Sequence, residues 1–178
     1  SLNIENCDFN DNRQGIYGTY VNYVEILNSN FLGSNDENIY FSQNANYLVD
    51  GCSFTGGSNG IRHTGNNQSN NGFIVNSEFQ GASGHAIDSQ YAQGGPYISN
   101  CSVHDNNSSI TNPRSVSNSV IYGNNNWGVE SNDINYTQVN NCTIVNNQNG
   151  VYNSTVSNSI IYFNGNTQHQ SSSISYSN

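Results

Sequence analysis

Several residues that could transfer a proton lie close together in the middle of the sequence. Arg62 is followed directly by His63, and Asp88 comes three residues after His85. A histidine with an acid and an arginine nearby could abstract a proton next to a carboxylate, as a polysaccharide lyase must do. The competing interpretation is that these histidines are ordinary loop or surface residues. Arg62, His63 and Asp88 therefore define one enzymatic hypothesis, which needs all three on one face.

Arg62 and Asp88 also belong to a set of residues that share one local pattern. Each follows an Ile or Val that is preceded in most copies by Gly or Asn, as in Gly15-Ile16. If that Ile or Val points into a core, its successor on an extended strand points outward, as does Thr111. Tyrosine rings can stack on sugars while their hydroxyl groups stay in water. We predict a carbohydrate-binding face formed by Tyr17, Tyr40, Arg62, Asp88, Glu130 and Tyr152.

A purely structural interpretation of the same residues stays open. Tyr and Thr are frequent in β-strands whatever their function. An Arg beside an Asp on a protein surface is often an ion pair of little energetic consequence.

The elements that would position these residues are indicated by an internal repeat. A hexapeptide recurs eight times, with the order apolar, any residue, Asn or Gly, Cys or Ser, any residue, apolar. A short strand cannot bury its apolar face alone, so repeated strands stack and share one core. We expect the first, fourth and sixth positions to point inward and the second and fifth outward. The copies begin at Ile4, Ile26, Val49, Ile74, Ile98, Val116, Val139 and Val156.

The third position of the hexapeptide predicts a sharp bend. Asn and Gly are the residues that best tolerate a left-handed backbone. We also expect the stacked Asn side chains to hydrogen-bond along the axis as a ladder. The residues at this position are Asn6, Asn28, Gly51, Asn76, Asn100, Asn118, Asn141 and Asn158.

The four cysteines occupy the fourth position in alternate copies, with Ser between them: Cys7, Cys52, Cys101 and Cys142. Stacked strands lie about 4.8 Å apart, so consecutive cysteines would be about 10 Å apart. A disulfide needs Cα atoms within roughly 7 Å. We expect four free, buried thiols, and neither a metal nor a cofactor.

These repeats resemble the right-handed parallel β-helix proteins of the pectin-lyase-like superfamily. The segments VSNSVIYGN from Val116 and VSNSIIYFN from Val156 are similar to repeats in large secreted bacterial surface proteins. The resemblance implies an all-β, right-handed single-stranded parallel β-helix of about eight coils over residues 1–178, with three strands per coil. The paired Asp and the D-P-H-D motifs of enzymes in this superfamily are absent, and the sequence contains no Lys.

Composition limits the choice of partner. The chain has three Arg, twelve acidic residues and a formal charge of −9. Three cations can neutralise few phosphates, so nucleic acid is a poor partner. No apolar run approaches the roughly 20 residues of a membrane span, so we expect no membrane insertion.

The sequence as a whole favours a non-catalytic extracellular or cell-surface β-solenoid, a structural or adhesive module in a surface or filament assembly. The alternative is a lyase acting on a uronate-containing polymer. Ile4 opens a coil near the start, and Ile174 and Tyr176 alternate with Ser as one more edge strand. We expect the chain to be an excerpt of a longer solenoid or a subunit that stacks end to end. The insertions at 66–71 and 90–96 would border a shallow cleft around Arg62 and Asp88.

Overall fold

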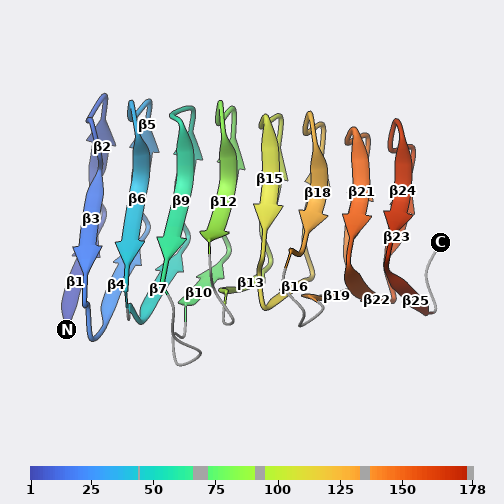
Figure 1. The fold of residues 1–178 in the computed structure, drawn as a ribbon. Helices are drawn as coiled ribbons and strands as arrows, with labels where there is room; N and C mark the ends of the chain where they lie inside the picture. Colours follow the sequence, from blue (N-terminus) through green and yellow to red (C-terminus); the bar gives the residue numbers. More distant parts are fainter. Residues whose placement is uncertain (44, 66–71, 91–94, 133–136, 176–178) are drawn as a thin grey trace.

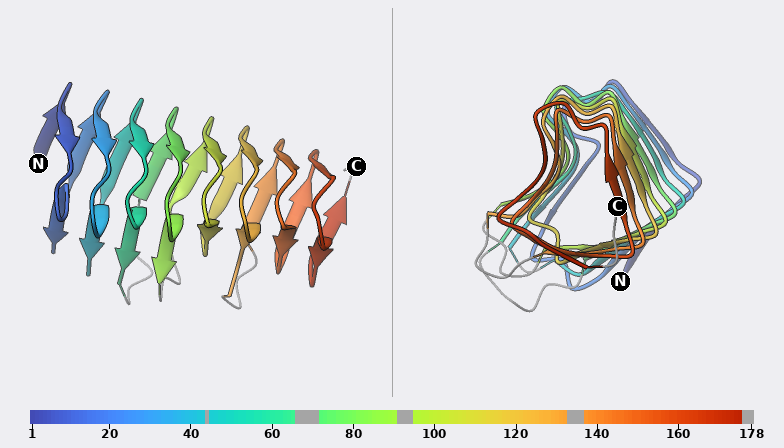
Figure 2. Two further views of the ribbon diagram at one scale, coloured as in Figure 1. Left: turned by 90° about the horizontal axis from the view of Figure 1, so that it is seen from above. Right: turned by 90° about the vertical axis from the view of Figure 1, so that its right-hand side faces the viewer.

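The computed structural model describes residues 1–43, 45–65, 72–90, 95–132 and 137–175, and it is a parallel β-solenoid (Figure 1). Every regular element in those ranges is a β-strand, and each coil contributes one strand to each of three parallel sheets. Viewed along the axis, the coils lie behind one another with similar outlines (Figure 2). The expected all-β, stacked-coil fold is confirmed.

Three sheets form the walls. Sheet A has nine strands: β1 (Leu2–Glu5), β4 (Val24–Leu27), β7 (Tyr47–Asp50), β10 (Gly72–Val75), β13 (Tyr97–Ser99), β16 (Ser115–Ser117), β19 (Thr137–Asn140), β22 (Ser154–Ser157) and β25 (Ser173–Ser175). Sheet B has eight: β2 (Asp8–Asn10), β5 (Asn30–Leu32), β8 (Ser53–Thr55), β11 (Glu78–Gln80), β14 (Ser102–His104), β17 (Val120–Tyr122), β20 (Thr143–Val145) and β23 (Ile160–Tyr162). Sheet C also has eight: β3 (Ile16–Thr19), β6 (Glu37–Ser42), β9 (Asn59–Thr64), β12 (His85–Gln90), β15 (Ser108–Thr111), β18 (Trp127–Glu130), β21 (Asn149–Tyr152) and β24 (Thr167–Gln170).

Each hexapeptide spans the corner between sheets A and B. All eight residues at its third position have a positive φ, from 47° at Asn28 to 65° at Gly51. This left-handed bend turns the chain from one sheet into the next, which explains the restriction to Asn and Gly. The backbone prediction for this position is confirmed.

The three positions of the hexapeptide that were expected to point inward line the interior, together with residues of the inner face of sheet C. Four phenylalanines at the sixth position form a stack along the wall of sheet B, with centroids 4.4–4.7 Å apart and planes within 4° of parallel. Stacking at one strand spacing buries both faces of each interior ring. The stacked residues are Phe9, Phe31, Phe54 and Phe79.

The cysteines are free, and three of the four are buried, while Cys7 in the first coil is half-buried. The alternation with Ser has a hydrogen-bonding basis. The backbone N–H of Cys101 donates to the hydroxyl of Ser119 in the next coil at 3.1 Å, and that hydroxyl donates to the carbonyl of Ser117. The other three Cys–Ser pairs repeat the first contact. Each serine hydroxyl therefore links two coils inside the tube.

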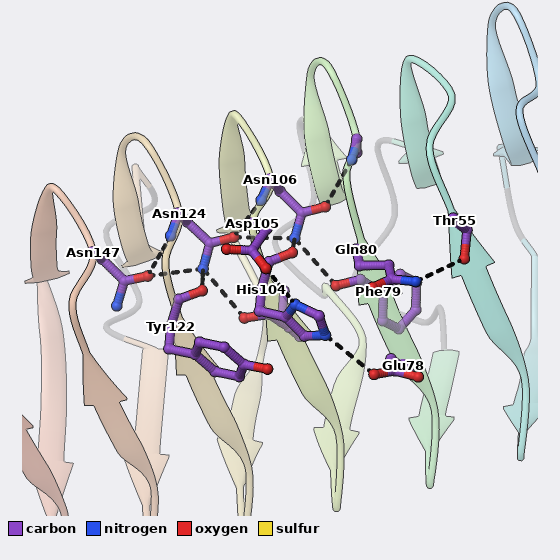
Figure 3. A network of polar contacts seen from close by, with 12 residues as sticks. Thr55, Glu78, Phe79, Gln80, His104, Asp105, Asn106, Tyr122, Asn124 and Asn147 are labelled. Carbon is purple, nitrogen blue, oxygen red and sulfur yellow. Dashed lines mark hydrogen bonds and ion pairs between the residues drawn. The ribbon is translucent and has the colours of Figure 1, made fainter.

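The longest asparagine ladder lies at a different corner from the one expected. At the sheet A–sheet B corner, side-chain bonds join Asn100 to Asn76 and Asn141 to Asn118, near the surface. The buried ladder lies instead in the turns that come directly after the strands of sheet B (Figure 3). There, the side-chain Nδ2 of each Asn donates to the side-chain oxygen of the next ladder residue at 2.8–3.1 Å. It consists of Asn106, Asn124, Asn147 and Asn164, and ends on Gln168. The sequence analysis missed it because it lies outside the hexapeptide.

At the C-terminal end, β25 pairs with β22 and places Ile174 beside Val156. The expected extra edge strand therefore forms, while Tyr176 lies outside the described residues. No helix long and apolar enough to cross a membrane occurs in the described ranges.

Candidate binding face

The outer face of sheet C carries the predicted row of residues. Cross-strand register places Tyr17 beside Tyr40, Tyr40 beside Arg62, and Arg62 beside Asp88. The register then continues through Thr111, Glu130 and Tyr152. The structure thus brings all six predicted residues into one row, which extends about 29 Å at one strand spacing per step.

An aromatic pair marks the N-terminal end of this row. The rings of Tyr17 and Tyr40 stack with centroids 5.2 Å apart and planes 18° from parallel. The Tyr17 ring is 62% exposed, and the Tyr40 hydroxyl is 2.9 Å from the Thr64 hydroxyl in the next coil. The pair therefore offers one open ring face above an anchored ring.

A second aromatic pair lies near the other end. The rings of Trp127 and Tyr152 have centroids 5.4 Å apart and are tilted by 44°. Trp127 is the single tryptophan of the chain, and the sequence analysis did not include it in the face. Both residues are half-buried, so part of each reaches solvent.

The centre of the row is a network of charged and polar groups around Arg62. Its guanidinium nitrogens lie 3.1 Å from Glu37 Oε1 and 3.5 Å from Asp88 Oδ2. A third nitrogen donates to the Gln90 side-chain oxygen at 2.8 Å. The other carboxylate oxygen of Glu37 accepts a hydrogen bond from Gln14. Arg62 is thus bound by protein groups from the coil before it and the coil after it, and its charge is matched within the face.

Two members of the row are less exposed than an outward position suggests. Asp88 is only 4% exposed, and Thr111 is also buried. Burial raises the pKa of Asp88, while His85, Arg62 and Gln90 oppose that rise. The middle of the row is therefore closed by its own side chains, and the accessible parts are the aromatic ends.

The sequence analysis also missed Glu37, for the same reason as Trp127. Each lies three residues before a member of the row, so strict alternation along the strand would point it inward. The two residues after Glu37, Asn38 and Ile39, are both fully buried, so alternation fails at that point. A search for polar or aromatic residues three positions before the row would have found both.

His63 does not join Arg62 and Asp88. It pairs in register with Phe41 and Ser89 on the inner face of sheet C and is 1% exposed. Its ring meets the edge of the Tyr47 ring at a centroid distance of 5.7 Å. Burial lowers the pKa of His63, although a hydrogen bond that the imidazole donates to the backbone of Gln43 acts in the opposite direction. The three residues of the lyase hypothesis are therefore divided between two faces of the sheet.

The remaining cations lie elsewhere. Arg13 pairs with Asp36, and Arg114 lies over the ring of Tyr97, which belongs to sheet A. Residues 66–71 and 91–94, which include most of the expected bordering insertions, lie outside the described residues. Among the described residues, no group of three or more His, Cys, Asp or Glu side chains could hold a metal ion.

A different histidine forms the clearest acid–histidine cluster. On the outer face of sheet B, His104 Nδ1 is 2.9 Å from Asp105 and Nε2 is 3.1 Å from Glu78 (Figure 3). The imidazole ring also stacks on Tyr122, with centroids 4.6 Å apart. Three neighbouring coils thus meet at this side chain.

Comparisons with protein-family models, with curated proteins and with solved structures each found no match.

Proposed function

We propose that this chain is a non-catalytic extracellular β-solenoid, a structural or adhesive module of a surface assembly, that contacts a polysaccharide through the outer face of sheet C. The observation that carries the proposal is the in-register row with an aromatic pair at each end. Tyr40 and Tyr152 are five strand spacings apart, about 24 Å, which suits an extended polymer better than a small molecule. The acidic composition and the resemblance to secreted repeats support the extracellular setting.

The charges of the face favour a neutral glycan. Glu37, Asp88 and Glu130 contribute three carboxylates, whereas Arg62 is the single arginine in the row. Because its guanidinium already contacts Glu37, Asp88 and Gln90, Arg62 has little capacity left to bind a uronate. Like charges would also repel an acidic polymer.

The same geometry gives less support to the alternative function, a polysaccharide lyase. His63 faces the interior, and a general base must reach the proton that it abstracts. The lyase predicts unsaturated products, measured as rising ultraviolet absorbance on a panel of uronate polymers. Such a rise, lost in Arg62→Lys, would replace our proposal with the catalytic one.

Binding is tested on an array of neutral and uronate-containing oligosaccharides. We expect wild type to bind neutral chains, and Tyr17→Ala with Tyr40→Ala to weaken binding by roughly tenfold, because stacking on aromatic rings is lost. Phe73→Ala is the matched control, since Phe73 and Tyr97 stack in the same way on sheet A, with centroids 5.2 Å apart. Equal binding by wild type and the double variant would remove sheet C as the binding face.

The strand edges support an assembly role for the same module. Within the described residues, β1, β2 and β3 each pair on one side only, and the Phe9 ring is only partly covered. A second copy stacked head to tail would pair with these strand edges and cover the Phe9 ring, giving open filaments. Electron microscopy should then show fibres that Phe9→Asp shortens. Wild type that never exceeds single particles would contradict this assembly.

A further inference from the structure

Sheet B changes character along the axis. In the last three coils its outward positions are mainly apolar, and they form a grid in register across β17, β20 and β23. Val120 and Ile160 lie on either side of Thr143, and Tyr122 and Tyr162 on either side of Val145. Ile160 is 50% exposed. In earlier coils the row that contains Val120 and Ile160 is polar: Asp8, Asn30, Ser53, Glu78 and Ser102.

Phe163, which follows this grid directly, lies in an unusual conformation. It is 69% exposed with φ 53°, in the left-handed region that a bulky side chain rarely adopts. The seven equivalent turn residues are all Gly, Asp or Asn: Asp11, Gly33, Gly56, Gly81, Asp105, Gly123 and Asn146. A strained aromatic residue held in solvent, with its ring 4.1 Å from that of Tyr162, suggests a contact with another molecule.

The charge distribution indicates what that molecule is. All twelve acidic residues and all three arginines precede residue 137. The remaining residues, 137–178, have no Asp, Glu, Lys or Arg. Most of the surface of this chain would repel its own copy, because the net charge is −9. The uncharged last coils are the part where two copies can meet without that repulsion.

We propose that a second copy of this chain docks on the patch formed by Val120, Tyr122, Val145, Ile160, Tyr162 and Phe163. The two-fold axis of this dimer runs parallel to β20 and lies midway between sheet B of one copy and sheet B of the other. It places Val120 opposite Ile160 of the second copy and Tyr122 opposite its Tyr162. Such a contact uses the same patch on both copies and closes at two. The two solenoids then run in opposite directions and overlap only in their last three strands of sheet B. The first coil of this overlap carries Glu130 on sheet C and the later coils carry no charged residue, so most of the acidic residues stay apart.

The size of the patch sets the strength of the dimer. Its Cα positions cover only about 10 Å across the strands and about 7 Å along them. This is well below the interface of a stable complex, so the dimer is weak, with Kd about 100 μM. It is also distinct from head-to-tail stacking, because that contact has no upper limit on the number of copies.

The test is sedimentation of the 178-residue chain over a range of concentration up to about 1 mM. Every sample, including the reference called wild type here, carries Phe9→Asp, so that head-to-tail stacking adds no larger species. We expect wild type to pass from monomer to dimer, and Ile160→Asn with Phe163→Asn to weaken the dimer more than tenfold. Both replacements place Asn where another coil already has it, at Asn30 and Asn146, so the variant should fold. Leu32→Asn is the matched control, because Leu32 is 47% exposed on the same sheet in an acidic coil, and it should dimerise as wild type does.

X-ray scattering measures the arrangement. The proposed overlap gives a dimer about 60 Å long, whereas two copies aligned over all coils would measure about 40 Å. Wild type that remains monomeric throughout, or a double variant that dimerises like Leu32→Asn, would overturn the proposal. So would a dimer of the shorter length.

Discussion

The Nε atom of Arg62 lies 3.5 Å from a carboxylate oxygen of Asp88, and this ion pair joins neighbouring strands β9 and β12. Asp88 is almost fully buried, so its carboxylate has lost most of its contact with water. Burial of a charge is costly unless a partner compensates it. Arg62 therefore stabilises the centre of sheet C as well as contributing to its surface.

Replacing Arg62 with Ala should destabilise the fold. The change leaves the buried Asp88 carboxylate without its cation and removes the contact with Glu37, and we expect a loss of about 2 kcal/mol in the free energy of unfolding at pH 7. Urea denaturation followed by Trp127 fluorescence measures it. Arg13→Ala is the control, because the Arg13–Asp36 pair is exposed and should contribute little.

The same variant should show a defined pH dependence. Burial raises the pKa of Asp88, so its ionised form is disfavoured in the folded state. The free energy of unfolding therefore falls as pH rises above the ordinary Asp pKa of about 3.9. Without Arg62 this penalty grows. We expect the gap between wild type and Arg62→Ala to shrink at pH about 4.5, where Asp88 can take up a proton. A gap that is constant between pH 4.5 and 8 would contradict this account of the pair.

The thiols should differ sharply in reactivity. Burial raises the pKa of Cys101 to about 11 and also raises those of Cys52 and Cys142. Only the thiolate is reactive, and Cys7 is the one half-buried cysteine. A chromogenic disulfide reagent at pH 8 should modify Cys7 in the native protein and the other three only after unfolding. Rapid modification of more than one thiol in native protein would argue against the closed interior.

The fold could be predicted because its determinants are local and repeated. Asn28 and Gly51 share a left-handed backbone, and one interior position alternates between Cys, as at Cys101, and Ser, as at Ser119. The residue types of one coil therefore predict those of the next. The buried ladder could have been found from the same repeat, because Asn106, Asn124, Asn147 and Asn164 each come three residues after the end of a hexapeptide. It was missed because the second to fourth copies have Ser, Gly and Ala at that position, so the pattern holds only in the later coils.

The row of residues on sheet C could be predicted only in part. Register follows from the repeat, so Tyr17 and Tyr40 were correctly placed in one row. The contacts around Arg62 depend on a break in strand alternation near Asn38, which residue types do not reveal. The interior position of His63 follows from alternation after Arg62, yet its polar character suggested the outer face.

His104 should make stability depend on pH. Its burial tends to lower the pKa, but the hydrogen bonds and charges of Asp105 and Glu78 outweigh that effect and raise it. A histidine whose pKa is raised by folding stabilises the fold at pH values below its pKa in the unfolded chain, about 6.5. This contribution is lost as pH rises through its pKa in the folded protein. We expect His104→Gln to lose more stability at pH about 5.5 than at pH about 8.5.

A nuclear magnetic resonance titration of the imidazole gives the direct measurement. The same imidazole in protein unfolded with urea supplies the comparison. A His104 midpoint in the folded protein below that in the unfolded protein would show that burial outweighs the two carboxylates, and the predicted sign would then be wrong.

The buried asparagine ladder should contribute more stability than the asparagines at the surface bend. Asn124 donates to the side-chain oxygen of Asn147 at 2.8 Å and accepts from Asn106, in a site closed to water. Asn124→Ala leaves the buried backbone N–H of Asn106 without its acceptor, the Asn124 side-chain oxygen at 3.0 Å, whereas the Asn106 amide keeps its bonds to the carbonyls of Phe79 and His104. We expect a loss of about 2–4 kcal/mol in urea denaturation. Asn118→Gly keeps the left-handed turn and removes only an exposed bond to Asn141, so its effect should stay within about 0.5 kcal/mol. Similar losses in the two variants would mean that backbone geometry at the bends, rather than the internal amide ladder, holds the coils together.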